Sequence, residues 1–194
     1  MALIANLIIF AAMALLGGLG SAWYMVEHGS RLTTRQLGPW MIWTAAGKPD
    51  ADPYTRAHFA RSGSLPAASS SERYYVAETD NEGRKLSSTC EYSIEGRGPN
   101  AQWWTLAVFD SRGLLIRNPA ERYAFNTSTI IRGTGGAYAI ALARDARPGN
   151  WLPTGGGGRL TVILSAYQLR LNEQLADETA EARELPSIRR VQCR

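Results

Sequence analysis

The sequence predicts a mainly β protein, an antiparallel β-sandwich or jelly-roll-like domain preceded by one N-terminal transmembrane helix. Residues 2–26 contain no charged side chain, whereas from Arg73 onward polar and apolar residues alternate over short segments. Turns rich in glycine and proline separate these segments. We therefore expect a transmembrane anchor at residues 1–27, a stalk with a short helix at 28–72, and a β domain at 73–194.

Composition limits the possible classes of protein. A chain of 194 residues can fill one hydrophobic core, and 45% hydrophobic and 20% charged residues are ordinary for a globular protein. The net charge is only +4, and the arginines are scattered, so no basic stripe for nucleic-acid phosphates is present. We expect no nucleic-acid partner.

The leading segment is long enough to cross a bilayer, because about 20 apolar residues span the roughly 30 Å hydrocarbon core. Trp23 and Tyr24 close the apolar run, as expected for rings at the headgroup level. A buried core helix is the alternative, but soluble helices that are apolar on every face are rare at this length. The sequence therefore predicts that the lipid bilayer is one partner of the chain.

Retention and orientation of this helix rest on opposing signals. Small residues at Gly20-Ser21-Ala22 resemble a signal-peptidase site, yet no Lys or Arg precedes the apolar run, so we expect an uncleaved anchor. Arg31 and Arg35 follow the helix, and the positive-inside rule alone would place the domain in the cytoplasm.

The two cysteines favour the opposite orientation. Cys90 and Cys193 lie far apart and show no metal-binding spacing; the alternatives are two unrelated buried thiols or one disulfide. A disulfide would close a loop of about 100 residues and stabilise the fold by about 4–5 kcal/mol in the chain-entropy model. We favour the oxidised state, in a single-pass protein of the inner membrane with its C-terminal domain in the periplasm.

The stalk contains an amphipathic patch and a helix. Residues 37–43 carry a tryptophan pair that would lie on the membrane or, more commonly, pack on the domain. Asp52 is placed as the N-cap and Pro53 as the first residue of a helix of two to three turns, which Gly63 ends.

Several strands follow. Residues 85–95 alternate cleanly, and Cys90 shares the core face with Leu86, Tyr92 and Ile94. Residues 103–109 are apolar on both faces, which predicts a central strand ended by a turn at 110–113. Further strands are expected at 74–77, 114–116, 129–132, 137–142, 159–169 and 187–192, with a weak helix at 173–182.

Several common catalytic patterns are missing from the sequence. It has no G-x-S-x-G turn, and its histidines are only His28 and His58, so we predict neither a metal site nor a catalytic triad. The glycine runs at 133–136 and 155–158 lack the following Lys-Ser/Thr of a nucleotide-binding loop and are interpreted as turns, so no cofactor is expected.

A set of polar and aromatic residues in apolar loops remains as the candidate ligand-binding site. Turn geometry is the simpler explanation for its asparagines, and a shallow polar-aromatic cleft for a glycan is the functional one. The set is Asp110, Asn118, Arg122, Tyr123, Asn126, Asn150 and Trp151.

Several stretches resemble an uncharacterised bacterial family, domain of unknown function 1214. These are Cys90–Gly96, Trp103–Asp110, Asn118–Tyr123 with Asn126, Pro148–Pro153 and Ser187–Val191. The resemblance covers about residues 75–193 and implies a β-rich, typically exported domain, often accompanied by a second uncharacterised domain. It therefore implies a separate protein partner in the envelope for this chain, and it supplies no catalytic residues.

Three functional hypotheses remain. The first is a non-enzymatic, membrane-anchored binding or accessory module of the bacterial envelope that binds a protein or a cell-wall glycan. The second is a carbohydrate-active enzyme or other hydrolase in which Asp110 and Glu121 act as acid and base. The third is an accessory subunit of a larger membrane complex, in which the helix itself makes the contacts.

Overall fold

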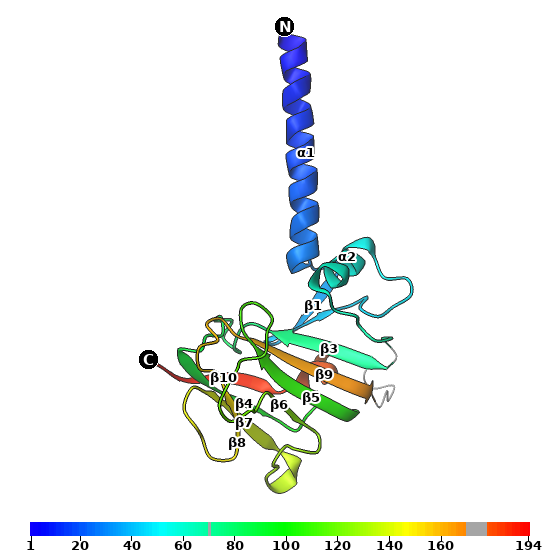
Figure 1. Ribbon diagram of the computed structural model, residues 1–194. Coiled ribbons are helices and arrows are strands. Elements are labelled where there is room, and N and C mark those ends of the chain that lie inside the picture. The colour runs from blue at the N-terminus through cyan, green and yellow to red at the C-terminus, as the bar shows by residue number, and fades with distance from the viewer. Residues whose placement is uncertain (70, 170–177) are drawn as a thin grey trace. The chain divides into compact units, whose positions relative to one another are not determined.

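The computed structural model of the chain describes residues 1–69, 71–169 and 178–194 (Figure 1). The chain forms two compact units. The N-terminal unit consists of residues 1–35 and 43–69, and the β domain consists of residues 36–42 and 70–194.

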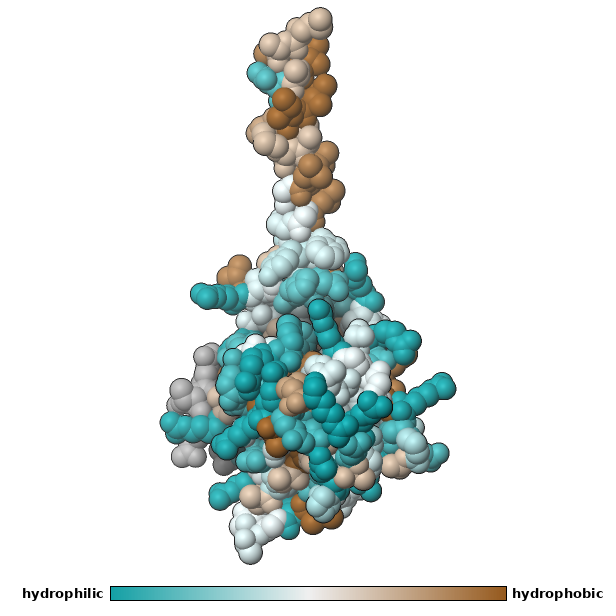
Figure 2. All heavy atoms as spheres, turned by 90° about the vertical axis from the view of Figure 1, so that its left-hand side faces the viewer, coloured by the Kyte–Doolittle hydropathy of each residue, from teal (hydrophilic) through white to brown (hydrophobic). Residues whose placement is uncertain are grey.

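Helix α1 (Ala2–His28) begins the N-terminal unit. None of its residues is buried, and it is long and apolar enough to cross a membrane by length and composition. Figure 2 shows hydrophobic residues gathered along this helix, whereas the visible face of the β domain is mostly hydrophilic. Such a helix fits either a membrane anchor or a signal sequence.

Helix α2 (Pro53–Ser62) has the predicted boundaries at both ends. The Asp52 side chain accepts hydrogen bonds from the backbone N–H groups of Tyr54 and Thr55, each at 3.0 Å. Gly63 ends the helix in the left-handed conformation, with φ of 68°.

Two sheets form the β domain (Figure 1). The strand order of the first sheet is β1 (Thr34–Leu37), β2 (Trp40–Trp43), β3 (Glu72–Ala77), β9 (Thr161–Leu169), β5 (Ala101–Phe109) and β6 (Ala124–Asn126). The order of the second is β10 (Ser187–Cys193), β4 (Cys90–Gly96), β7 (Tyr138–Ala143) and β8 (Asn150–Pro153). Strands β7 and β8 pair in parallel. Antiparallel pairing joins β10 to β4 and β4 to β7 in the second sheet, and β2 to β3, β3 to β9, β9 to β5 and β5 to β6 in the first. The predicted mainly antiparallel β fold is confirmed.

One hydrophobic core lies between the sheets, with Trp104, Leu106 and Leu164 from the first and Ile94 and Leu142 from the second. The predicted alternation before and along β4 is confirmed, because Leu86, Cys90, Tyr92 and Ile94 are all buried. Regular pairing nevertheless begins only at Cys90, and Lys85 and Ser87 form isolated bridges.

Three local expectations have different outcomes in the structure. The patch at 37–43 lies largely in strand β2, where the buried Trp40 indole donates to the carbonyl of Pro186 at 2.7 Å. The strand expected at 129–132 is wrong, because the Asn126 carboxamide accepts the N–H groups of Ser128 and Thr129 and folds this segment as a turn. The expected helix at 173–182 falls partly outside the described residues, within which α3 spans Glu178–Glu184.

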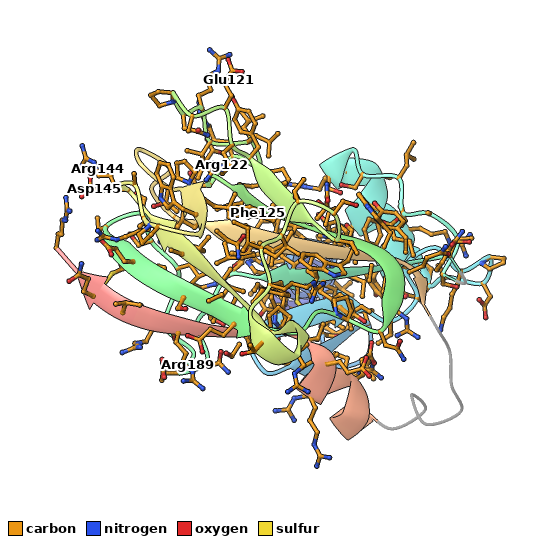
Figure 3. The ribbon with its side chains drawn as sticks, turned by 90° about the horizontal axis from the view of Figure 1, so that it is seen from below. Glu121, Arg122, Phe125, Arg144, Asp145 and Arg189 are labelled. Carbon is orange, nitrogen blue, oxygen red and sulfur yellow. A yellow bond between two sulfur atoms is a disulfide. The ribbon has the colours of Figure 1, made fainter. Side chains whose placement is uncertain are left out.

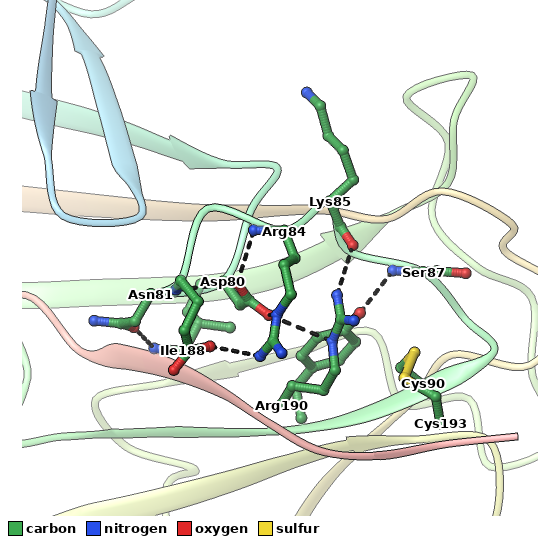
Figure 4. A network of polar contacts seen from close by, with 11 residues as sticks. Asp80, Asn81, Arg84, Lys85, Ser87, Cys90, Ile188, Arg190 and Cys193 are labelled. Carbon is green, nitrogen blue, oxygen red and sulfur yellow. Dashed lines mark hydrogen bonds and ion pairs between the residues drawn. A yellow bond between two sulfur atoms is a disulfide. The ribbon is translucent and has the colours of Figure 1, made fainter.

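A buried ionic network and a disulfide hold β10 in place (Figure 4). The fully buried Asp80 carboxylate accepts from the backbone N–H of Arg84 and pairs with the Arg84 and Arg190 side chains, at 2.9 and 3.3 Å. Cys90 and Cys193 are directly opposite each other on β4 and β10, and they form the predicted disulfide. The C-terminal strand is therefore tied both to its neighbouring strand and to the loop before β4.

Candidate functional site

A cleft with a volume of about 1320 Å³ lies in the β domain where β4, β7 and β10 meet their loops. Three segments line it: the β4–β5 loop from Arg97 to Asn100, the loop from Ile131 to Ala137, and the end of α3 with the start of β10. All three belong to the β domain.

One of two stacked aromatic rings lines the cleft. Tyr138 lines it and is buried, and its ring stacks on the buried Trp104 ring at 5.2 Å between centroids. The Arg132 guanidinium lies over both rings, 5.9 Å from the Trp104 centroid and 5.6 Å from that of Tyr138. The two sheets thus contribute one ring each beneath a cationic group.

Backbone geometry holds the loops close to these rings. Gly98 has φ of 94°, and a Cβ there would lie 2.7 Å from the Trp104 indole nitrogen, so only glycine fits. Arg132 then joins the two loops, because its Nη1 donates to the carbonyls of Arg97 at 2.8 Å and Gly136 at 2.7 Å. The Arg132 side chain is therefore preorganised.

Positive charge predominates in the cleft. Two carboxylates, those of Glu95 and Glu184, line this arginine cleft together with four arginines: Arg97, Arg132, Arg183 and Arg189. Glu95 pairs with Arg189 at 4.0 Å, and Glu184 accepts the backbone N–H of Asn100 at 3.1 Å. Within the described ranges the remaining arginines, Arg97, Arg132 and Arg183, form no ion pair with a carboxylate.

Tyr138 provides an unusual neutral group at this site. Burial raises the pKa of its hydroxyl well above the ordinary value, although the nearby Arg132 opposes the shift. The Tyr138 hydroxyl is buried and has no hydrogen-bond partner among the described residues. It therefore remains a protonated hydrogen-bond donor over the physiological pH range.

The asparagines predicted from the sequence hold loops together. Asn118 donates to the carbonyls of Ile116 and Arg122 and accepts the N–H of Arg122. The buried Asn150 carboxamide joins three segments, because it accepts from Ile131 and donates to the carbonyls of Ile131 and Ala139. The contacts of Asn118 and Asn126 have the geometry expected of turns, whereas Asn150 joins segments that are distant in the sequence.

Asp110 is also part of a turn. Its Oδ1 accepts the N–H groups of Arg112 and Leu114, and its Oδ2 pairs with the Arg112 guanidinium at 3.0 Å. These bonds, led by the one from Leu114, hold the pKa of the Asp110 carboxyl below its ordinary value. A general acid requires a raised pKa, so the environment of Asp110 does not suit that role.

Arg122 and Trp151 are predicted site residues that lie 29 positions apart in the sequence and come together in the fold. The Arg122 guanidinium is 5.9 Å from the centroids of both Trp151 and Phe125, and its Nη1 lies 3.4 Å from the Trp151 carbonyl. Tyr123 is half-buried next to Arg122 in the chain. Figure 3 shows Arg122 on a different side of the β domain from Arg189, which lines the cleft.

Sequence reasoning missed the arginine cleft because its residues come from three distant segments. Arg97 and Arg132 each stand in a glycine-containing turn, the sequence pattern that places their side chains at the domain surface. Nothing in the sequence indicates that these turns converge. Within the described ranges, no group of three or more His, Cys, Asp or Glu side chains is positioned to hold a metal ion.

Residues 71–170 match the model of the family described as "Protein of unknown function (DUF1214)". The chain belongs to this family. The DUF1214 segment contains strands β3–β9, and with them Arg97, Arg132 and Tyr138, whereas Arg183 and Arg189 lie beyond its end. A comparison with curated proteins finds no match.

Two solved structures resemble this DUF1214 protein. The VPA0106 protein from Vibrio parahaemolyticus is 18% identical, with a TM-score of 0.61 over 91% of this chain and 43% of that chain. A putative uncharacterized protein from Burkholderia cenocepacia is 15% identical, with a TM-score of 0.49 over 69% of this chain and 33% of that chain. The chain thus spans less than half the length of either structure, and the first likeness supports the fold alone.

Proposed function

We propose that this DUF1214 protein is a membrane-anchored, extracytoplasmic binding module of the bacterial envelope. In this proposal α1 holds the chain in the cytoplasmic membrane, and the β domain lies in the periplasm. The length and apolar composition of α1 support the anchor, and the Cys90–Cys193 disulfide supports an oxidising compartment.

The ligand we propose carries carboxylate or phosphate groups and binds in the arginine cleft. The observation that carries this proposal is the absence of carboxylate partners for Arg97, Arg132 and Arg183 around one cleft, within the described residues. A planar guanidinium binds carboxylate and phosphate with two parallel hydrogen bonds. The described lining residues include no exposed aromatic ring, so stacking of a neutral sugar is not supported.

A binding measurement with the full chain in detergent tests this proposal. The probes are oligogalacturonate for carboxylates, inorganic polyphosphate for phosphates, and maltohexaose as the neutral comparison. We expect binding of at least one anionic probe, no binding of maltohexaose, and weaker binding at higher salt. Arg97→Gln combined with Arg183→Gln should weaken binding by about ten-fold or more, because a hydrogen bond to a charged group contributes roughly 1.5–3 kcal/mol.

Arg117→Gln is the matched control, because Arg117 is an exposed arginine outside this cleft with no ion pair among the described residues. It makes the same change in charge per residue and should leave binding intact. If neither anionic probe binds, or if the double variant binds as well as the wild type, the proposed site is wrong.

A further inference from the structure

Helix α2 is fastened to the last turn of α1 by two contacts. His58 Nδ1 lies 2.8 Å from the Val26 carbonyl oxygen, and because that oxygen can only accept, the ring nitrogen donates. The last carbonyls of a helix lack partners within the helix, so His58 satisfies one of them. Arg61 also pairs with Glu27 at 3.2 Å. These two contacts keep α2 beside the C-terminal end of α1.

Trp43 contacts the face of the His58 ring. Its ring stacks on the His58 ring at 4.2 Å between centroids and meets the buried Phe59 ring edge-on at 6.1 Å. Because His58 is thus held between an aromatic face and a backbone carbonyl, α2 cannot swing away without breaking both contacts. The N-terminal unit therefore behaves as one piece at this point.

The length of α1 sets the depth of this piece in a bilayer. At about 1.5 Å per residue, its 27 residues extend roughly 40 Å, whereas the hydrocarbon core is about 30 Å thick and the full bilayer about 40–45 Å. With Trp23 and Tyr24 at the edge of the hydrocarbon, the last turn of α1 reaches the headgroups. Helix α2, packed on that turn, then lies at headgroup level.

The turn that follows α1 exposes the side chains expected there. The Ser30 carbonyl accepts the N–H groups of Thr33 and Thr34, which turns the chain immediately after α1. Leu32 at the tip is 87% exposed, and the neighbouring Arg31 forms no ion pair among the described residues. Arg31 and Leu32 follow the end of α1 by three and four residues. Because an extended chain spans at most about 3.5 Å per residue, both lie within about 14 Å of the membrane interface at the end of α1.

We propose that the N-terminal unit binds anionic phospholipid headgroups, with Arg31 at the lipid phosphates and Leu32 at the acyl boundary. Apolar side chains with adjacent basic ones are the combination that binds an interface. This inference rests on the proposed anchoring of α1 and adds a second contact with the same membrane. Its consequence is that the lipid contacts of Arg31 and Leu32 hold α1 at the depth in the bilayer that its length allows.

Depth-dependent quenching tests the proposal in the full chain. No free cysteine is present, so Leu32→Cys introduces a single reactive thiol for an environment-sensitive fluorophore. The labelled protein is reconstituted into phosphatidylglycerol or phosphatidylcholine vesicles that contain a lipid spin-labelled near the headgroup. We expect strong quenching at position 32, more in phosphatidylglycerol, and loss of that lipid preference in Arg31→Gln.

Leu114→Cys is the matched control, because Leu114 is a 54% exposed leucine of the β domain. Arg31→Gln should leave quenching at 114 unaltered, and an unchanged lipid preference at position 32 in Arg31→Gln would overturn the proposal. Resistance to alkaline extraction reports the anchor separately. An inserted chain whose label at 32 is not quenched overturns this inference and leaves the anchor intact, whereas an extracted chain overturns both.

Discussion

Two buried tyrosines of the four-stranded sheet differ in one hydrogen bond. Tyr92 and Tyr138 each lie beneath a guanidinium, that of Arg190 at 5.7 Å and that of Arg132 at 5.6 Å. The Tyr92 hydroxyl accepts the N–H of Ser87 at 3.0 Å, whereas that of Tyr138 has no partner among the described residues. A buried polar group without a partner costs about 1–3 kcal/mol.

Tyr138→Phe should therefore raise the free energy of unfolding by about 1 kcal/mol, because it removes a buried hydroxyl and leaves the ring stacked on Trp104. Tyr92→Phe is the matched comparison and should lower it by about 1 kcal/mol, because the Ser87 N–H loses its acceptor. Urea unfolding with unchanged m-values measures both. If Tyr138→Phe is as destabilising as Tyr92→Phe, its hydroxyl has a partner in solution.

The residue types predict roles within a short segment more reliably than roles in a site that is built from distant segments. The sequence placed Asp52 as a cap, and its side chain accepts the first N–H groups of α2, because capping depends on neighbours within three residues. The turn contacts of Asn118 and Asn126 depend on equally short separations, whereas Asn150 bonds to residues 11 and 19 positions away. Convergence of distant residues does not depend on near neighbours. The sequence pattern therefore groups Asp110 and Asn150 with Arg122, although Asp110 forms a local turn and Asn150 bonds to Ile131 and Ala139.

At the level of elements, period-2 alternation predicted the strands that bury one face. Cys90, Tyr92 and Ile94 alternate on β4, and the disulfide partner of Cys90 lies directly opposite on β10. Strand β8 was not predicted, because it is short, ends in proline and pairs in parallel with β7. A parallel neighbour is reached through a crossover, and the chain between β7 and β8 carries no signal for the direction of that pairing.

An ion pair holds this β7–β8 connection to β4. Arg147 Nη2 contacts the Glu91 carboxylate oxygens at 2.6 and 2.7 Å, and Arg147 Nε is at 3.2 Å. The Arg147 side chain holds the pKa of Glu91 below its ordinary value of 4.5, although desolvation opposes this shift. The stabilisation is thus fully present above pH 4.5 and is lost as the pH falls through the lowered pKa of the folded state.

Glu91→Gln should lower the melting temperature at pH 7, and the difference from wild type should shrink steadily below about pH 4.5. Glu78→Gln is the control, because Glu78 pairs with Lys85 at 2.8 Å but both side chains are more than half exposed. Such surface pairs contribute little, so this variant should match the wild type. A Glu91→Gln deficit that stays constant down to pH 2 would show that packing, rather than the charge, is lost.

At the scale of the whole molecule, the three-dimensional fold collects charge that the sequence disperses. Arg97, Arg132 and Arg183 are spread over 87 residues and meet around one cleft only because β4, β7 and the end of α3 adjoin there. Composition therefore gave the net charge correctly but could not locate it. The apolar segment α1 was easier to predict, because its signal is contiguous in the sequence.

The disulfide links the fold of the whole chain to its compartment, because the 103-residue separation of Cys90 and Cys193 encloses most of the β domain. Denatured wild-type protein, prepared from cells with free thiols trapped, should react with a maleimide only after reduction. Cys90→Ser with Cys193→Ser should lower the free energy of unfolding by about 4 kcal/mol, by releasing the constraint on the unfolded chain. Exposed Leu114→Cys provides a separate reporter of topology.

We expect a membrane-impermeant maleimide to label Leu114→Cys in cells whose outer membrane is permeabilised and whose cytoplasmic membrane is intact. The reason is that the proposed topology places the β domain outside the cytoplasmic membrane. Cytoplasmic proteins in the same cells should stay unlabelled. Oxidised cysteines together with a labelled position 114 would mean that two arginines after α1 do not set its direction, as expected when a long domain is translocated. Free thiols together with a protected position 114 would reverse the topology and place the arginine cleft among cytoplasmic anions.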